Sequence, residues 1–415
     1  PVGSRAEPEP PTAPTPPVVT AAPVAMPAPV ALVVPSLAWS SAIANAVVVP
    51  WVTWVVVPLD LLGVALSPLA PSWAGASWQL AAKLWALLWR ALEFLAASCP
   101  ATWLPRAPGV AGAAALIAGL LLMLAPLGRL RHVLGAALVA GALYLPPPRP
   151  PPQSFRLTVL DVGQGQALVV ETARHVLVFD PGPRSFAGRD AGEDVVLPYL
   201  RRQGWRVLDT LIVSHADSDH AGGARAVLAG MEVASLVLSP GDPAPGPAGR
   251  CHAGDGWRWD GVSFRFLSPY RDAPAAASDN ALSCVLEVDA DGRRALLAAD
   301  IEGQAEGRLV AAGDLAPVDV VVAPHHGSAT SSSAAFVAAT RPGFVVFSRG
   351  HRNRFGMPSP AVEARYRAVG AQLLDTARDG ALTLELGPRG VETRRARGAL
   401  AGYWRIRDSP LLPQP

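Results

Sequence analysis

The sequence predicts a helical membrane-spanning region followed by a mixed α/β domain. Half of its 415 residues are hydrophobic and only 16% are charged, an unusually apolar balance for a soluble protein. Long uncharged runs fill much of the first 147 residues, whereas short apolar strands alternate with helical stretches beyond residue 154. A proline block, PPPRPPPQ at 146–153, lies between the two halves and is typical of a stiff spacer.

Charge and cysteine content set only broad limits. The net charge of +2 does not by itself indicate a nucleic-acid binder, because such binding depends on clustered Lys and Arg. The three cysteines show no CxxC spacing, which excludes a zinc ribbon, but Cys251 and Cys284 leave room for one disulfide in an oxidising compartment. The chain begins with Pro1 rather than Met, so we expect a fragment or a processed product.

The N-terminal segment, residues 1–35, is rich in proline and alanine and has no helical or alternating period. Such a composition buries no core, so we expect a linker or a disordered segment. Residues 36–147 are expected to form transmembrane helices. The apolar run at 42–66 contains Pro50 and Pro58, which predict kinked or broken membrane helices.

The clearest predicted span is PGVAGAAALIAGLLLMLAPL at 108–127, which has the roughly 20 uncharged residues needed to cross hydrocarbon. A buried helix of a soluble core is the alternative. Residues 77–98 are amphipathic and fit an interfacial helix better. If the run at 133–147 forms a membrane hairpin with the predicted span, Arg129 and Arg131 face the cytoplasm and the later residues lie outside it.

Polar residues gather at the end of a predicted strand, in VSHADSDHAGG at 213–223. They follow the apolar run LDTLIV, so we expect them on a tight loop that turns several side chains toward one point, with glycines allowing a sharp exit into a helix. Imidazole and carboxylate ligands without thiolate suit zinc and manganese. The loop carries four candidate ligands, namely His215, Asp217, Asp219 and His220.

Two later strands also end in residues of the ligand type. RALLAAD ends in Asp300, and VDVVVAPHHGS carries His325 and His326. A single Asp or His after a strand is usually a turn or cap residue. Three such strand ends in one domain, however, predict a metal site.

The combined pattern resembles the metallo-β-lactamase superfamily, whose signature HxHxDH is matched by HADSDH. The resemblance implies a four-layer αββα sandwich with two divalent ions at one edge of the sheets. It also implies how the ligands divide between the ions: His215 and Asp217 on the first, Asp219 and His220 on the second, Asp300 bridging them, and His325 or His326 completing the second.

Two departures from the superfamily pattern concern the first ion. Asp217 stands where most members carry histidine, so the site is richer in oxygen, which favours manganese or weakens zinc binding. A further histidine is missing between the two blocks, which predicts a first site that is partly occupied or empty in the resting protein. Its local substitutes are Asp279, Asn280 and Ser283, with an ordinary polar turn as the alternative.

Within the superfamily, the chain resembles the ComEC family of DNA-internalisation competence proteins. Residues 44–63 resemble the end of that family's channel domain. Four further stretches carry the resemblance: LDVGQGQA at 160–167, SHADSDHAGG at 214–223, SDNALSCVLEV at 278–288 and APHHGSATSSS at 323–333.

The resemblance implies a hydrolase domain at residues 155–400, after a proline linker at 148–154 and before a tail at 401–415. It also implies a multi-pass protein of the inner membrane, with the hydrolase domain on the periplasmic side. DNA and other competence proteins are the implied partners. Elements that the family carries upstream of the channel's end are not found in this sequence, so we expect a carboxy-terminal portion or a truncated relative.

The DVGQG stretch invites a dinucleotide-binding interpretation, which fails because the third glycine is absent and the chain continues as a strand. In the family pattern Asp161 and Gln164 lie beside the metal loop, and we expect a supporting role for both. Ser328 is expected to offer its hydroxyl or backbone N–H to a phosphate oxygen, with a plain turn as the alternative.

The loop RGHRNRFGMPSP at 349–360 departs from the family at Met357, where many relatives carry histidine, and His351 is a nearby replacement. Its arginines predict contacts with a phosphate backbone, with a solvated basic loop as the alternative. These arginines are Arg349, Arg352 and Arg354.

Metal-dependent hydrolysis of DNA phosphodiesters is the leading hypothesis for function. The family resemblance implies that one strand of incoming duplex is degraded while the other crosses the membrane. Asp219 would both ligate a metal and orient the attacking hydroxide. A histidine, His325, His326 or His351, would protonate the leaving oxygen. The alternatives are a metallo-hydrolase of another ester and a catalytically weak DNA-docking cap on the channel.

Overall fold

The structure is a computed structural model with two compact units, Pro1–Leu145 and Pro146–Pro415. The linker expected at 1–35 and the tail expected at 401–415 lie outside the described residues. The described residues are 36–37, 39–98, 102–103, 110–126, 128–144, 148–184, 188, 190–242, 248–274 and 277–397.

The first helical stretch of the N-terminal unit passes both prolines without a break. Helix α2 (Trp39–Trp51) continues through a π-helical segment, η1 (Val52–Val56), into α3 (Val57–Leu66). Proline removes a backbone donor from the regular α-helical ladder, and the wider π-turn lies between Pro50 and Pro58. Within this stretch, Ala44–Leu66 is the one helix of the described residues that is long and apolar enough to cross a membrane.

Helix α4 (Pro71–Ser98) packs against α3 through polar contacts to the backbone. Ser77 Oγ donates a hydrogen bond to the Leu59 carbonyl at 2.7 Å, and Trp78 Nε1 donates to the Asp60 carbonyl at 3.3 Å. A Cβ on Gly63 would lie 2.3 Å from Trp78 Nε1, so glycine lets the indole approach the helix closely. The amphipathic segment expected at 77–98 is thus part of a longer helix.

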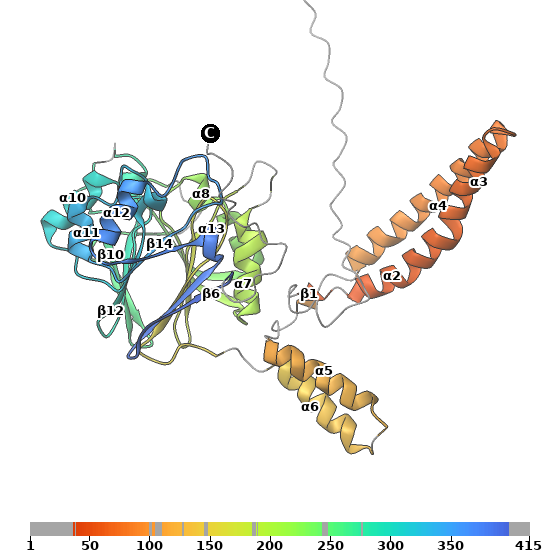
Figure 1. Cartoon of the computed structure of the whole chain (residues 1–415), viewed down its shortest axis with the longest axis horizontal. Helices are drawn as coiled ribbons and strands as arrows, with labels where there is room; N and C mark the ends of the chain where they lie inside the picture. The colour runs from red at the N-terminus through yellow and green to blue at the C-terminus, as the bar shows by residue number, and fades with distance from the viewer. Residues whose placement is uncertain are drawn as a thin grey trace, which may run out of the picture. The chain divides into compact units, whose positions relative to one another are not determined.

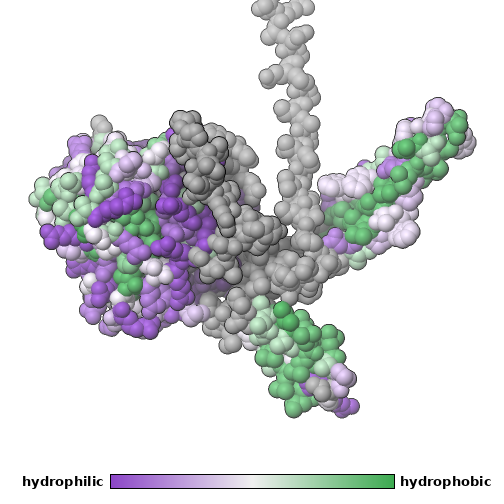
Figure 2. All heavy atoms as spheres, viewed as in Figure 1, coloured by the Kyte–Doolittle hydropathy of each residue, from purple (hydrophilic) through white to green (hydrophobic). Residues whose placement is uncertain are grey.

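Helices α5 (Val110–Leu124) and α6 (Leu130–Tyr144) form a hairpin. They cross closely at Gly119 and Gly135, since a Cβ on Gly119 would lie 2.8 Å from the Gly135 carbonyl oxygen. With 15 residues, α5 is shorter than the span expected at 108–127 and shorter than the roughly 20 residues that cross hydrocarbon. Apolar side chains lie on the outer surfaces of the helices in this unit (Figure 2). A short pair, β1 (Ser36–Leu37) with β2 (Thr102–Trp103), completes the described part.

The second unit is built on two packed sheets (Figure 1). The eight-stranded sheet is antiparallel from β17 to β5 and parallel from β5 to β8. In spatial order its strands are β17 (Gly390–Arg395), β16 (Leu382–Gly387), β3 (Phe155–Val159), β4 (Ala167–Glu171), β5 (Val176–Pro181), β6 (Val207–Val213), β7 (Glu232–Leu238) and β8 (Gly249–Arg250).

The seven-stranded sheet is parallel from β15 to β12 and antiparallel from β12 to β9. In spatial order its strands are β15 (Gln372–Asp375), β14 (Phe344–Phe347), β13 (Val320–Val322), β12 (Arg293–Leu297), β11 (Val285–Ala290), β10 (Val262–Ser268) and β9 (Gly256–Trp259).

Helices cover the outer face of each sheet, so the unit has the four αββα layers that the sequence predicts (Figure 1). Strands β4 and β5 are buried along their whole length, as expected for strands covered on both faces. One side carries η2 (Gly192–Val196), α7 (Leu197–Arg202) and α9 (Ala224–Gly230), and the other carries α10 (Gly303–Ala312), α11 (Ala334–Thr340) and α12 (Pro360–Ala368).

A disulfide between Cys251 and Cys284 joins the two sheets. Cys251 follows β8 of the eight-stranded sheet, and Cys284 precedes β11 of the seven-stranded sheet. Both cysteines are fully buried in the core between the sheets. The disulfide for which the sequence leaves room is therefore formed in the structure.

Candidate metal centre

The first ligand loop begins where β6 ends at Val213. His215 lies two residues beyond the strand end, and Asp217 keeps an extended backbone as the residue before α8 (Ser218–Ala221). His220 lies on α8 and is fully buried. The loop closes tightly at Gly222, where a Cβ would lie 2.2 Å from a backbone nitrogen of the neighbouring 183–184 segment. Sharp turns after a strand thus bring both imidazoles to the same side of the sheet edge.

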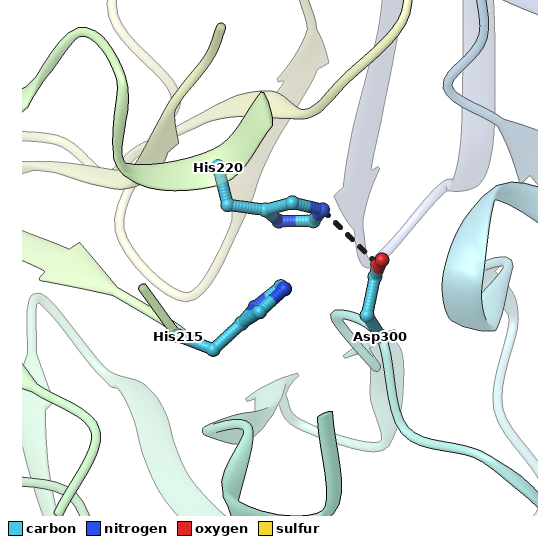
Figure 3. Close-up of side chains that lie close together, drawn as sticks. All are labelled: His215, His220 and Asp300. Carbon is cyan, nitrogen blue, oxygen red and sulfur yellow. Dashed lines mark ion pairs between the residues drawn. The ribbon is translucent and has the colours of Figure 1, made fainter. Parts of the chain in front are cut away.

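Three buried side chains from opposite sheets converge at this edge (Figure 3). The rings of His215 and His220 lie 4.2 Å apart between centroids, and His220 Nε2 lies 3.1 Å from Asp300 Oδ1. One ligand atom from each residue lies within 4.8 Å of the other two. His215 and His220 follow β6 of one sheet, and Asp300 follows β12 of the other. The strand ends predicted to share a site do meet.

A second group of ligand atoms shares His220 with the first group. His326 lies in the short helix η4 (Pro324–Gly327), and its Nε2 is 3.2 Å from His220 Nε2 and 3.3 Å from Asp219 Oδ2. Asp300 Oδ2 lies 3.7 Å from the same His326 nitrogen. Asp300 therefore faces both groups, as a bridging carboxylate would.

Asp180, at the end of β5, organises two of these histidines. Its buried carboxylate accepts hydrogen bonds from Gln166 Nε2 at 3.0 Å and from the Ser214 backbone N–H at 2.7 Å. It also accepts from the Ser214 hydroxyl and from His220 Nδ1, both at 2.8 Å. Because the Ser214 hydroxyl donates to Asp180, its oxygen accepts from His215 Nδ1 at 3.0 Å. In their neutral forms both imidazoles then present Nε2 as the free donor atom for a metal.

Asp180 is not among the site residues predicted from the sequence. The signal was present, because VFDPG ends an apolar strand in a carboxylate, as RALLAAD does. Asp180 also has a positive φ of 58°, a backbone conformation that only a few per cent of residues other than glycine adopt. Such conformations persist where the surrounding structure holds them and are concentrated at functional sites.

The two adjacent histidines of η4 have different surroundings. His326 is buried, and its Nδ1 donates to the Ser348 carbonyl at 2.8 Å, which leaves Nε2 facing the ligand cluster. His325 is more exposed; its Nδ1 lies 3.1 Å from Glu302 Oε1 and its Nε2 lies 3.7 Å from Asp300 Oδ2. Both residues have left-handed backbone, with φ of 49° and 54°, which turns the neighbouring rings in different directions. The geometry favours His326 as the ligand.

Two buried atoms at the centre have no hydrogen-bond partner among the described residues, although hydrogen bonding is the rule for buried polar atoms. They are His215 Nε2 and Asp300 Oδ1. Asp300 Oδ1 lies near His220 Nε2, but the two atoms do not have the geometry of a hydrogen bond. A divalent cation held by nitrogen and carboxylate oxygen would satisfy both atoms. The residues present therefore fit the metal ions that the superfamily pattern implies.

Opposite charges at the centre stabilise the ionised carboxylates. Burial alone would raise the pKa of Asp219, but its hydrogen bond to His326 and the field of His220 lower it to about 2. Burial also opposes ionisation of Asp300, yet the neighbouring His220 and His326 hold its pKa well below the usual range. These carboxylates are thus ionised, and ready to bind a cation, throughout the neutral range.

The two histidines of the HADSDH loop have pKa values shifted in opposite directions. Burial lowers the pKa of His215, reinforced by the nearby His220. Burial would also lower the pKa of His220, but the charges of Asp300 and Asp180 raise it well above 6.5. Without a metal, His220 therefore holds a proton that a metal ion would displace.

Two models of known protein families match different parts of the chain. Residues 160–351 match the family model described as "Metallo-beta-lactamase superfamily", and residues 5–129 match the model described as "Competence protein". "Competence protein ComA" of Neisseria gonorrhoeae is 36% identical over 374 residues, which cover 89% of this chain and 51% of that protein. The first part of the chain is thus similar to the competence protein family, and its second unit to the metallo-β-lactamase superfamily.

Two further relatives of this chain carry different names. "Recombination protein 2" of Haemophilus influenzae is 34% identical over 254 residues, which cover 60% of the chain and 31% of that protein. "ComE operon protein 3" of Bacillus subtilis is 28% identical over 250 residues, 54% of the chain and 32% of that protein. This chain spans about half or less of the length of the curated relatives that it matches.

Solved structures resemble the chain only distantly. Zn²⁺-bound PqqB from Methylobacterium extorquens matches with a TM-score of 0.37 at 13% identity, covering 56% of this chain and 99% of that one. CmlA, a diiron β-hydroxylase from Streptomyces venezuelae, matches with a TM-score of 0.38 at 13% identity, covering 65% and 57%. Structural similarity at these TM-scores has no bearing on the function of this chain.

The remaining metal-ligand candidate, Asp217, lies at the rim of the centre. Its Oδ2 is 3.4 Å from His215 Nε2, and its side chain is 53% exposed. It is therefore close enough to share an ion with His215 while keeping contact with solvent.

The supporting residues proposed near the DVGQG stretch have different contacts. Gln164 Oε1 accepts from the Gly350 backbone N–H at 3.2 Å, which ties this stretch to the 349–360 loop. Asp161 instead pairs with Arg397. Gly165 packs against the metal loop so tightly that a Cβ would lie 2.4 Å from the Asp219 carbonyl oxygen.

The substitutes expected for the missing histidine lie in and beside the short helix η3 (Asn280–Leu282). Asp279 precedes it, and Ser283 follows it with a buried hydroxyl that has no hydrogen-bond partner among the described residues. Asp242 is also not among the residues predicted from the sequence. Burial and the charge of Asp279 raise its pKa, despite the opposing fields of Arg250 and His215. The charges of Asp279 and His215 therefore both act on Asp242.

Ser328 and Arg349 are engaged within the fold. The Ser328 backbone N–H donates to the His325 carbonyl at 2.8 Å, and its hydroxyl lies 3.0 Å from Thr330 Oγ1. Arg349 Nε donates to Asp375 Oδ2 at 2.7 Å. The other candidates of the 349–360 loop, His351, Arg352 and Arg354, are exposed.

Proposed function

We propose that this chain is a membrane-anchored, metal-dependent phosphodiesterase that cleaves DNA during its uptake across the inner membrane. The observation that carries the proposal is the convergence of three imidazoles whose Nδ1 atoms are engaged elsewhere, beside two ionised carboxylates. Nitrogen and carboxylate ligands without thiolate are typical of hydrolytic metal centres, whereas many structural zinc sites contain cysteine.

Two divalent ions, manganese or zinc, are the proposed cofactors. When bound, such ions lower the pKa of a water and neutralise charge on phosphate oxygens. The oxygen-rich first site, with Asp217 in place of a nitrogen ligand, favours manganese. The proposed ligands are His215, Asp217, Asp219, His220, Asp300 and His326.

Three residues of the chain would act on the substrate and the attacking water. Asp219 lies at the mouth of the centre with its side chain 34% exposed, so its ionised carboxylate can accept a hydrogen bond from the water. His326 is held by its Nδ1 bond to Ser348 and stabilises that carboxylate at 3.3 Å. His351, exposed on the adjoining loop, is proposed to protonate the leaving oxygen.

Features outside the centre support DNA as the substrate and a periplasmic location for the hydrolase unit. Relatives matched over much of the chain are named as competence proteins, and the apolar helix Ala44–Leu66 is long enough to span a bilayer. The Cys251–Cys284 disulfide suits an oxidising compartment such as the periplasm. Other proteins of the competence machinery are the proposed partners in the membrane.

Cleavage of linear DNA by the full chain in detergent tests this function. With Mn²⁺ present, the wild-type chain should degrade DNA, whereas Asp219→Ala should lower the rate by about 100-fold or more, as expected for loss of a group that acts on the reacting atoms. Asp289→Ala serves as the matched control, because it removes a carboxylate of strand β11 that pairs with Arg294 of β12, outside the ligand groups. Absence of cleavage by the wild type, or equal rates for wild type and Asp219→Ala, would overturn the proposal.

A further inference from the structure

The structure assigns a second binding element to the hydrolase unit: a base-stacking platform for single-stranded nucleic acid on the loop 350–358. We propose that the Phe355 ring stacks on an unpaired base while Arg352 and Arg354 contact the flanking phosphates. This inference rests on the proposed function and specifies the form of nucleic acid that the centre receives.

Phe355 is unusual in its exposure. It is 54% exposed, and it is the one exposed Phe, Tyr or Trp among the described residues of the second unit. The other exposed large hydrophobic side chains of that unit's described part are Val207, Leu228 and Val369, which are aliphatic and offer no π-face. An aromatic ring in this position is suited to stacking on a nucleobase, which does not depend on base identity.

Two arginines lie on the same loop as the ring. The guanidinium carbon of Arg354 lies 4.9 Å from the centre of the Phe355 ring, within the range of a cation–π contact. Arg352 is also exposed on the same loop. An anionic strand could therefore place a base against the ring and its phosphates against the arginines, a combination typical of single-strand binding grooves.

Hydrogen bonds inside the loop fix the backbone that carries the ring. Asn353 Oδ1 accepts from the backbone N–H groups of Phe355 at 3.2 Å and Met357 at 3.1 Å. Asn353 Nδ2 donates to the Met357 carbonyl at 2.7 Å. Because these bonds already order the loop, stacking a base on Phe355 requires little further loss of backbone entropy.

Both ends of the loop are attached to the metal centre. Before the loop, the Ser348 carbonyl accepts from His326 Nδ1 at 2.8 Å. After it, the Ser359 backbone N–H donates to the Gly327 carbonyl at 2.9 Å, one residue beyond His326. Phe355 precedes Ser359 by four residues, so it lies within about 14 Å of that anchor. A strand stacked on Phe355 would thus pass within a few nucleotides of the centre.

A single strand fits this platform better than a duplex. In duplex DNA the base faces are stacked on one another, so a protein ring reaches them only by unstacking a base pair, which costs a few kcal/mol. Phosphates are accessible in both forms. The ring should therefore discriminate between single strands and duplex, whereas the arginines should contribute to both.

Binding of the metal-free full chain in detergent to a fluorescent 20-nucleotide thymidine oligomer tests the inference, with the matching duplex as comparison. Phe355→Ala should weaken single-strand binding by about 5- to 150-fold without changing the salt dependence. Arg352→Ala and Arg354→Ala should each reduce the slope of log affinity against log salt by about 0.7. Phe355→Trp should retain binding, and Val369→Ala, which removes another exposed apolar side chain, should have no effect.

Two outcomes would overturn the platform. One is unchanged single-strand affinity in Phe355→Ala; the other is an equal loss with Val369→Ala, which would indicate a general apolar contact. A separate assay of bis(p-nitrophenyl) phosphate hydrolysis with Mn²⁺ distinguishes this failure from failure of the proposed function. The small substrate bypasses the platform, so Phe355→Ala should hydrolyse it at the wild-type rate, and loss of that activity would also contradict the inference.

Discussion

Asp180→Asn should weaken metal binding without adding or removing a metal ligand. In its best orientation the amide oxygen replaces Asp180 Oδ2, which accepts from Gln166, Ser214 Oγ and His220 Nδ1, and the amide nitrogen then faces the donating Ser214 backbone N–H at 2.7 Å. The bond to His220 also changes from charged to neutral. Such a change lowers the contribution of one hydrogen bond by about 1–1.5 kcal/mol, or roughly tenfold in affinity. With the misplaced donor included, we expect a 10- to 100-fold loss of affinity for Mn²⁺.

Calorimetric titration of the metal-free chain with Mn²⁺ measures this effect, and Asp260→Asn is the matched control. The Asp260 carboxylate is also buried and also accepts from a histidine, His175, together with Thr172 and Arg174, but it lies outside the ligand groups. Both variants should lose thermal stability, whereas only Asp180→Asn should lose metal affinity. An affinity within about twofold of the wild type in Asp180→Asn would refute the positioning role of Asp180.

Three further predictions concern protons, packing and the disulfide. Because the pKa of His220 is raised in the metal-free protein, Mn²⁺ binding at pH 7 should release about one proton. The heat of binding should then depend on the buffer, and the affinity for Mn²⁺ should fall as pH is lowered. A heat of binding that does not depend on the buffer would contradict this. The protonated His220 stabilises the metal-free fold below its unfolded pKa of about 6.5, and that stabilisation should disappear as pH rises through the higher folded value. Gly165→Ala should lower stability by about 1–3 kcal/mol more than Gly163→Ala, because only the former Cβ meets the Asp219 carbonyl, at 2.4 Å, and equal melting temperatures would argue against it. Cys251→Ser should lower the free energy of unfolding by about 3–4 kcal/mol relative to the disulfide-bonded wild type, because the disulfide closes a loop of 33 residues. Urea denaturation measures this loss, and the reduced wild type should show the same loss.

The fold and the ligand loop could be predicted because they depend on local patterns. Apolar runs that end in His215, Asp300 and His326 mark strands whose ends meet at a sheet edge, and the structure brings these residues within contact distance. The αββα layers followed from the family resemblance and are confirmed by the two sheets and their covering helices. Residue type and strand order were sufficient for this level of description.

Features that depend on strand neighbours and backbone geometry could not be predicted. The role of Asp180 requires β5 and β6 to pair in parallel, with Phe179 opposite Ile212, so that the two strand ends lie side by side. The pairing of Arg349 with Asp375 likewise arises because β14 and β15 are neighbours in the sheet. None of these pairings is encoded in a short segment of sequence.

The difference between the two adjacent histidines has a conformational origin that residue spacing does not reveal. Left-handed backbone at both histidines of η4 directs His326 into the centre and leaves His325 beside Glu302. Sequence alone therefore identified the histidine pair without deciding between its members.

Metal content of the two histidine variants tests the central claim most directly. After incubation with Mn²⁺ and removal of free metal, elemental analysis should find more than one ion per chain in the wild type and in His325→Gln, consistent with a two-metal site. His326→Gln, which removes the buried Nε2 ligand, should lose at least half of that metal. Less than one ion per chain in the wild type, or equal metal in both variants, would contradict the metal centre described above.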